Sequence, residues 1–206
     1  FVDVFDDQNI NSELIEKVIT EKTKAILPVH LTGRIANMNK IIEIGEKYNI
    51  PVIEDAAQAI GSKYNNKPSV AFGKVGCFST HPLKNLNVWS DGGVVVTDDT
   101  DIYQSLKLIR NHGLQNRDTV AILGCNSRLD TIQAVVGNWL LPTTREITKK
   151  RIENATYYDE AFRDISEIKV PTRPSDYKIV YHLYMVLAER RDELLRHCIA
   201  NGIEAK

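Results

Sequence analysis

Two hydrophobic periodicities alternate along the first hundred residues. Short apolar runs at Lys24 to His30 and Pro51 to Glu54 flank a segment, Met38 to Tyr48, in which apolar positions recur every three or four residues. Runs of the first kind are typical of buried strands, whereas the second spacing predicts a helix. Strand, helix and strand in this order predict a βαβ unit with parallel strands and a right-handed crossover. In such an α/β fold, ligands bind beyond the carboxyl ends of the strands.

Further elements are predicted on both sides of this unit. The other predicted strands and helices are strands over Cys77–Thr80, Gly93–Thr97 and Ile179–Ala188, and helices over Glu13–Thr20, Thr100–Asn111, Thr144–Phe162 and Asp192–Asn201. Another helix begins near Leu129, and Pro142 is expected to break or kink it. Pro171 and Pro174 suggest a boundary between domains. We therefore expect a large domain over residues 1–165 and the start of a small α+β domain over residues 166–206.

The composition narrows the function classes. With 43% hydrophobic residues, 26% charged residues and a net charge of −1, the chain has the balance of a globular domain. It has no basic cluster that would predict a nucleic-acid partner, and its apolar runs are far shorter than the roughly 20 residues that span a membrane. Three widely spaced cysteines fit a reducing cytoplasm. No glycine-rich phosphate loop and no complete metal-ligand cluster occurs.

An acidic side chain follows the second predicted strand of the unit. Glu54 and Asp55 come directly after the apolar run Pro51 to Ile53. Burying a carboxylate costs several kcal/mol unless a cation or hydrogen-bond donors compensate it. Asp55 can therefore cap a following helix or pair with a cationic atom of a ligand.

A lysine and a serine lie in the glycine-rich stretch that follows. Lys84 falls in the loop after the predicted strand Cys77–Thr80, and Ser79 stands five residues earlier. A lone loop lysine is usually a solvated charge. A strand-end acid, a serine for phosphate and a loop lysine are, however, the groups that hold pyridoxal phosphate as a Schiff base in an enzyme.

Six short motifs occur in the order and rough spacing of one known family. They are Val29-His30-Leu31-x-Gly33, Glu54-Asp55-Ala56-Ala57-Gln58-Ala59-x-Gly61, Ser79-x-His81-Pro82-x-Lys84-Asn85-Leu86, Asp91-Gly92-Gly93, Asn111-His112-Gly113 and Gly124-x-Asn126-x-Arg128-x-x-x-x-Gln133-Ala134. Across essentially all 206 residues the chain resembles the sugar aminotransferases of the DegT/DnrJ/EryC1/StrS family. These are pyridoxal phosphate enzymes of fold type I. The resemblance implies an α/β large domain with a mainly parallel, seven-stranded-type sheet between helices, followed by a small domain.

The resemblance also implies roles for individual residues. Lys84 matches the lysine that forms the Schiff base and later moves the proton as general acid and base. Asp55 matches the acid that pairs with the pyridinium nitrogen, which keeps the ring an electron sink. Gln58 matches the residue that hydrogen-bonds near the 3-hydroxyl of the cofactor. Ala57 would pack against one face of the ring, and Ser79 matches a phosphate ligand.

Other positions concern the partner subunit and the substrate. Asn126 matches the residue that reaches the phosphate of the neighbouring subunit's cofactor, which implies a homodimer with shared active sites. His30, Trp89, His182 and Tyr184 are candidates for the substrate pocket. For His30, a satisfied core histidine is an equal alternative. His182 and Tyr184 would share one face of the predicted strand Ile179–Ala188.

The function expected from the resemblance is amine transfer, with glutamate as donor and a keto-sugar, usually nucleotide-linked, as acceptor. Such reactions serve the biosynthesis of cell-surface polysaccharides or of secondary-metabolite sugars. One alternative is a sugar dehydratase on the same fold, but those enzymes carry histidine in place of the Schiff-base lysine, which Lys84 argues against. Another is a non-catalytic binding or regulatory protein that keeps the fold.

The length of the chain bears on these expectations. Members of the family are considerably longer than 206 residues. We therefore expect further sequence before Phe1, with more phosphate contacts, and further small-domain sequence after Lys206. The 206 residues alone are not expected to bind pyridoxal phosphate tightly or to turn over.

Overall fold

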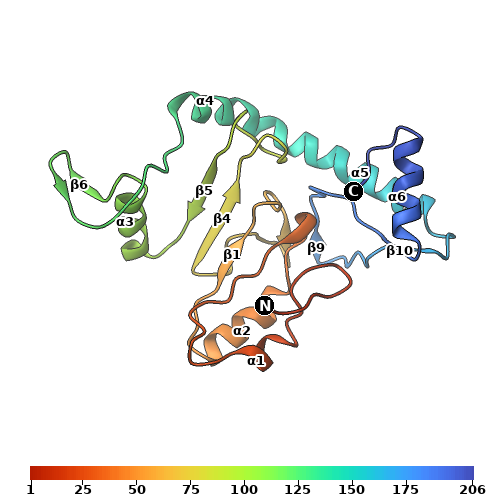
Figure 1. Cartoon of the computed structure of the whole chain (residues 1–206), viewed down its shortest axis with the longest axis horizontal. Coiled ribbons are helices and arrows are strands. Elements are labelled where there is room, and N and C mark those ends of the chain that lie inside the picture. The colour runs from red at the N-terminus through yellow and green to blue at the C-terminus, as the bar shows by residue number, and fades with distance from the viewer.

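The helix and the second strand of the predicted βαβ unit are present in the structure. The computed structural model describes residues 1–206, and its central sheet has the strand order β1 (Ile53–Asp55), β4 (Val75–Ser79) and β5 (Gly93–Val96). β1 and β4 are parallel, with Asp55 opposite Cys77, whereas β5 is antiparallel to β4. In Figure 1, the helices α4 (Thr131–Leu140) and α5 (Thr144–Ala161) run along one side of this sheet, and α2 (Met38–Lys47) lies on the opposite side.

The predicted strand Lys24–His30 forms two isolated parallel bridges, Ile26 with Val52 and Val29 with Asp55, instead of a continuous strand. The main-chain N–H groups of Ile26 and His30 donate to the carbonyls of Pro51 and Asp55, both at 2.9 Å. Between them, residue 28 would donate the next bond of a parallel ladder. Pro28 has no N–H, so the ladder is interrupted there.

The first helices differ in how well the pattern predicted them. α2 has the predicted extent, and the Asn37 side chain caps it by accepting from the Lys40 main-chain N–H at 3.4 Å. The predicted helix Glu13–Thr20 is only the single turn α1 (Ile15–Val18). It ends where the β-branched residues Val18, Ile19 and Thr20 follow one another, and such residues lose side-chain freedom in a helix.

The hydrophobic core lies between α2 and the strands of the βαβ unit. Its members are Ile15, Ile26, Ile35, Ala36, Met38, Ile41, Ile44, Val52 and Tyr64. All come from the first 64 residues of the chain. The central sheet therefore has a densely packed support on the side of α2.

A series of helices and a hairpin follows β5. Asp99 caps the N-terminus of α3 (Thr100–Ile109), because its side chain accepts from the N–H groups of Asp101 and Ile102. Strands β6 (Leu114–Asn116) and β7 (Thr119–Val120) form an antiparallel hairpin. The break expected at Pro142 is confirmed, because the 3-10 turn η2 (Leu141–Thr143) separates α4 from α5.

The last forty residues contain one strand that pairs with the first part of the chain and two strands that pair with each other. β9 (Tyr177–Lys178) pairs with β2 (Lys63–Tyr64), which also pairs with β3 (Lys67–Pro68). Near the end, β8 (Ile168–Lys169) and β10 (Leu187–Ala188) form an antiparallel pair beside α6 (Arg191–Ala200).

The predicted strand Ile179–Ala188 is wrong for most of its length, since only Leu187 and Ala188 are in a strand. Tyr181 has a φ of 47°, which ends any extended run, and Val180 N–H donates to the Gly33 carbonyl. None of the helices in the structure is both long and apolar enough to pass through a lipid bilayer.

Candidate active site

Three of the predicted site residues lie at one edge of the central sheet. Asp55 is the last residue of β1 and Ser79 is the last residue of β4. Lys84 stands in the loop that leaves β4, where its main-chain N–H donates to the His81 carbonyl at 2.8 Å. Because β1 and β4 are parallel, their carboxyl ends share this edge, which is where ligands bind in α/β sheets.

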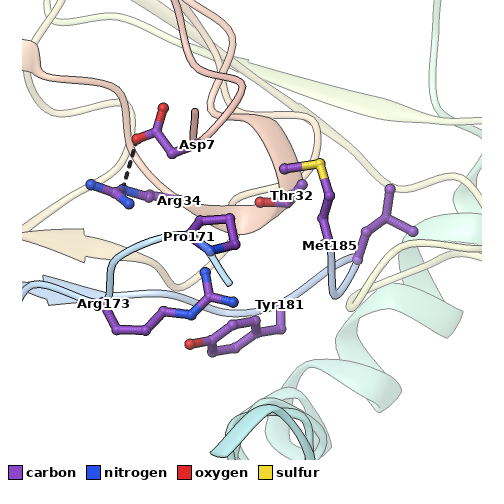
Figure 2. Close-up of a pocket in the computed structure, with 8 residues that line it drawn as sticks. Asp7, Thr32, Arg34, Pro171, Arg173, Tyr181 and Met185 are labelled. Carbon is purple, nitrogen blue, oxygen red and sulfur yellow. Dashed lines mark ion pairs between the residues drawn. The ribbon is translucent and has the colours of Figure 1, made fainter. Parts of the chain in front are cut away.

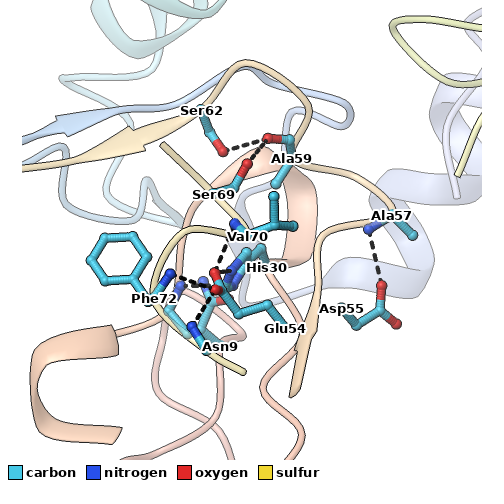
Figure 3. A network of polar contacts seen from close by, with 12 residues as sticks. Asn9, His30, Glu54, Asp55, Ala57, Ala59, Ser62, Ser69, Val70 and Phe72 are labelled. Atoms are coloured by element: carbon cyan, nitrogen blue, oxygen red, sulfur yellow. Dashed lines mark hydrogen bonds and ion pairs between the residues drawn. The ribbon is translucent and has the colours of Figure 1, made fainter. Parts of the chain in front are cut away.

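Asp55 is half-buried, and it forms no ion pair with the chain. Its Oδ1 accepts from the Ala57 N–H at 2.9 Å (Figure 3). A turn follows instead of the helix that Asp55 could have capped. Its negative charge, together with burial as the larger cause, raises the pKa of the Cys77 thiol on the neighbouring strand. The carboxylate is therefore a charge at the sheet edge without a cation of its own.

Glu54, the neighbour of Asp55, points to the other face of the strand and is fully buried. Its carboxylate accepts from the main-chain N–H groups of Val70, Phe72 and Gly73 at 2.9, 2.7 and 2.6 Å. Figure 3 shows Val70, Phe72 and His30 around this carboxylate. Burial raises the pKa of Glu54, but the hydrogen bonds from His30, Gly73 and Phe72 outweigh it, and the net pKa is lowered.

His30 is a core residue, and its place in the predicted substrate pocket is corrected. The side chain is fully buried, with Nε2 2.9 Å from Glu54 Oε2. Nδ1 accepts from the Ala36 N–H at 3.3 Å, so the proton of the neutral ring is on Nε2. Both ring nitrogens are thus occupied by the protein. The alternative of a satisfied core histidine is the one that the structure supports.

Lys84 has one polar side-chain neighbour, His182, which comes from the opposite end of the chain. Lys84 Nζ is 3.5 Å from His182 Nε2. Burial lowers the pKa of His182 to about 4, with further contributions from the charges of Lys84 and Arg151. The imidazole is therefore neutral near pH 7. His182, predicted to meet substrate, contacts the candidate Schiff-base lysine.

Gln58, Ala57 and Ser79 surround the same edge. Gln58 Oε1 accepts from the Thr32 N–H at 2.6 Å, which leaves the amide NH₂ of Gln58 free to donate. Ser79 Oγ accepts from the His81 N–H at 3.3 Å, so its own hydroxyl proton is available to an anion. Ala57 is half-buried.

The remaining candidates lie apart from one another. Asn126 is exposed and forms an antiparallel bridge with Asn111. Trp89 is 68% exposed, and its ring meets that of Trp139 edge-to-face at a centroid distance of 6.3 Å. Tyr184 does not share a strand face with His182, because residues 182–184 are not in a strand. The Tyr184 hydroxyl donates to Asp159 Oδ1 at 2.8 Å. Burial and Asp159 raise the pKa of this hydroxyl.

Two hollows of the structure lie away from this edge. Figure 2 shows the side chains that line the first of them, with the ion pair between Asp7 and Arg34. Its volume is about 10 Å³, room for a single water. A wider hollow of about 480 Å³ lies between residues 4–10 and residues 172–177. Neither is lined by a predicted site residue.

Arg151 is a residue that sequence reasoning missed. It stands in the charged helix α5, and its Nη1 donates to the main-chain carbonyls of Tyr181 and His182 at 3.0 and 3.1 Å. Nothing distinguished it from the other charged residues of that helix. Asn85 does occur in the lysine motif, and its Nδ2 donates to the Val180 carbonyl at 3.0 Å.

Several known proteins are similar to this chain in sequence. The chain is 37% identical over 199 residues to dTDP-3-amino-3,4,6-trideoxy-alpha-D-glucose transaminase of Streptomyces venezuelae, covering 97% of this chain and 52% of the relative. It is 38% identical over 197 residues to a pleiotropic regulatory protein of Geobacillus stearothermophilus, covering 95% and 53%. Other relatives are named as transaminases or aminotransferases of dTDP- or UDP-linked sugars. The chain spans about half the length of the curated relatives it matches.

The fold agrees as well. The crystal structure of DesV from S. venezuelae superposes with a TM-score of 0.94 at 37% identity, over 98% of this chain and 55% of that one. The sequence model of the DegT/DnrJ/EryC1/StrS aminotransferase family matches residues 1–206. Sugar aminotransferases of this family depend on pyridoxal phosphate. The chain therefore belongs to the DegT/DnrJ/EryC1/StrS aminotransferase family.

Proposed function

We propose that this protein is a pyridoxal phosphate-dependent aminotransferase that delivers an amino group to a keto-sugar. The observation that carries the proposal is the position of Asp55, Ser79 and Lys84 at the shared carboxyl edge of β1 and β4. A carboxylate, a hydroxyl and an amine at one sheet edge match the three polar parts of the cofactor: ring nitrogen, phosphate and aldehyde.

The charges and hydrogen-bonding groups that these side chains leave available fit pyridoxal phosphate. Asp55 keeps a carboxylate without a cationic partner in the chain, and Ser79 keeps a hydroxyl proton to donate. Lys84 has only the neutral ring of His182 as a polar side-chain contact. Two further polar atoms, Oγ1 of Thr80 directly after β4 and Nδ1 of His182, are buried without a hydrogen-bond partner.

When bound, the cofactor supplies an electron sink that stabilises negative charge on an attached amino carbon. Asp55 would hold a proton at the ring nitrogen by its negative charge, and Ser79 would donate to a phosphate oxygen. Gln58 would donate from its free NH₂, while Thr32 fixes its orientation through the bond to Oε1. Lys84 would bind the cofactor covalently through Nζ and, when released, carry a proton on that atom.

Two alternatives are less well supported. A dehydratase of this fold would have histidine where Lys84 stands, so the presence of the lysine favours amine transfer. A regulatory role is suggested by the name of one relative. Lys84, Asp55 and Ser79 are all present, and each keeps a polar group that is available to a ligand. The hypothesis of an enzyme is therefore the stronger one.

The finer parts of the proposal concern donor, acceptor and assembly. We infer glutamate as the donor and a nucleotide-linked keto-sugar as the acceptor, since several relatives are named for dTDP- or UDP-linked sugars. The pathway would build sugars for a cell-surface polysaccharide or a secondary metabolite. A homodimer that shares its active sites is supported by the exposure of Asn126, and three free cysteines favour the cytoplasm.

The proposal is tested with the full-length protein and added pyridoxal phosphate. A visible absorbance band should appear, Lys84→Ala should abolish it, and Lys74→Ala should leave it intact, because Lys74 is an exposed residue paired with Asp99. Labelled glutamate should then transfer its nitrogen to a member of a panel of dTDP- and UDP-linked keto-sugars. A wild-type protein with neither band nor transfer would contradict the proposal.

A further inference from the structure

Residues 180–183 cross from the C-terminal part of the chain to the loop that carries Lys84. Three separate elements hold this segment. Val180 N–H donates to the Gly33 carbonyl at 3.1 Å, and Asn85 Nδ2 donates to the Val180 carbonyl at 3.0 Å. From α5, Arg151 donates to the carbonyls of Tyr181 and His182. The backbone on both sides of the His182 ring is therefore fixed.

Gly33 allows the close approach of this segment. It has a φ of 99°, which disfavours any residue with a Cβ. A Cβ there would lie 2.8 Å from Val180 Cγ2, 2.9 Å from Tyr181 N and 3.1 Å from His182 N. The glycine of the motif Val29-His30-Leu31-x-Gly33 thus acts through packing, because it permits the C-terminal segment to reach the sheet edge.

The His182 ring is placed to accept a hydrogen bond from Lys84. Its Nε2 is 3.5 Å from Lys84 Nζ, a long contact of the kind that often tightens only when substrate binds. The charged side chains near it are both cationic, Lys84 from the loop after β4 and Arg151 from α5. Burial and two cations disfavour a third positive charge, so the ring stays neutral. Because the ammonium of Lys84 can only donate, its contact with Nε2 makes Nε2 the acceptor and places the ring proton on Nδ1.

We propose that His182 is a positioning residue for Lys84, which holds the amine of Lys84 at the carboxyl edge of β1 and β4 through Nε2. This inference rests on the proposed function, in which Lys84 carries the reacting amine. Lysine has a long flexible stem, and without a fixed acceptor its ammonium samples many positions. Nε2 of His182 is the fixed acceptor for Lys84.

The contact is tested without cofactor. In the full-length protein, the pKa of His182 is measured by nuclear magnetic resonance of the ring in wild type, Lys84→Met and Lys74→Met. Lys84→Met should raise the pKa from about 4 towards its ordinary value, because one of the two cations is lost. Lys74→Met should leave it unchanged. A pKa that is the same in wild type and Lys84→Met would overturn the contact.

The consequence of the contact is tested with two substitutions at one position. His182→Gln keeps an acceptor at the distance of Nε2, whereas His182→Leu removes it at similar volume. We expect the single-turnover rate with the amine donor to fall about 10²-fold in His182→Leu, the cost of a misplaced reacting group, with an unchanged KM. His182→Gln should recover most of that loss.

Equal rates in wild type and His182→Leu, or equal losses in both variants, would overturn the positioning role. Failure of the proposed function looks different. If the wild type transfers no amine while His182 still responds to Lys84→Met, the proposed aminotransferase activity fails and the contact stands.

Discussion

The helices α2, α3 and α4 have the same length, ten residues each, but only α2 is buried. Four α2 residues lie in the interior, whereas α3 and α4 have none. In α4 the large apolar side chains Ile132 and Trp139 are 74% and 68% exposed. The same kind of apolar spacing thus produces a core helix in one region and an uncovered helix in another.

This difference shows where the rigidity behind the candidate site comes from. Val52, the residue before β1, packs in the core with α2, and β1 contains the fully satisfied carboxylate of Glu54. The region of α3 and α4 contributes no side chain to that core. In the 206-residue chain, substitutions in the βαβ unit should therefore affect folding, and equivalent substitutions in α3 or α4 should have little effect.

The largest expected effect is that of Glu54→Ala. The change leaves three main-chain N–H groups and the Nε2–H of His30 without an acceptor in the core. Removing one partner of a buried charged network typically costs about 3–5 kcal/mol. Urea unfolding of this variant should show that loss, while Glu46→Ala on the exposed face of α2 should stay within about 0.5 kcal/mol of wild type.

Glu54 also makes the stability of the unit depend on pH. Its pKa is lowered in the folded protein from an ordinary value of 4.5, so its contribution is complete above about pH 4.5 and is lost as the pH falls through the folded pKa. The gap in unfolding free energy between wild type and Glu54→Gln should therefore narrow from pH 7 to pH 3. A constant gap would contradict the role of the ionised carboxylate.

The next effect is local opening, measured by hydrogen exchange of the 206-residue chain. Amides in the middle of α2, such as that of Ile44, should exchange only through global unfolding, because that helix is packed in the core. Amides of α4, such as that of Val136, should exchange at least about tenfold faster, since an uncovered helix opens locally. Equal protection in the two helices would mean that the comparison of buried and uncovered helices is wrong.

A smaller effect is expected from matched deletions of one methyl group. Ile41 in α2 is fully buried, and Ile132 in α4 is largely exposed. Ile41→Val should lower the free energy of unfolding by about 1 kcal/mol, in the range of 0.5–1.5 kcal/mol seen for buried isoleucines. Ile132→Val should change it by less than about 0.5 kcal/mol. Similar losses from both variants, in chemical denaturation, would contradict the difference in packing.

Most of the βαβ unit could be predicted from the sequence, because burial on one face leaves a periodic signal. The exceptions have local causes. Pro28 interrupts a strand whose apolar pattern is continuous. Ile179 and Val180 are buried as the pattern suggests, but against the first unit and without strand pairing. Apolar alternation reports burial, and it does not report which backbone conformation achieves it.

The site was predictable to the same degree. The positions of Asp55 after a strand and of Lys84 in the loop after another strand could be predicted, but that β1 and β4 are parallel neighbours ending at one edge comes from the structure. The contact between Lys84 and His182 joins residues 98 positions apart, so no local spacing could indicate it. For His30, the sequence left two interpretations open, a residue of the substrate pocket or a satisfied core histidine. The buried partner Glu54 decides for the second.

The smallest expected effect concerns the exposed tryptophan pair of the uncovered region. Trp89 and Trp139 meet edge-to-face, but each is 68% exposed, so little apolar area leaves the solvent when they touch. A double-mutant cycle with Trp89→Ala and Trp139→Ala should give a coupling energy of about 0.5 kcal/mol, the low end for aromatic pairs. Trp89 also has a φ of 62°, a strained value for a large side chain, so Trp89→Gly should destabilise less than Trp89→Ala. A coupling above about 1.5 kcal/mol would show that this region packs as tightly as the βαβ unit, and the contrast between the two regions would fail.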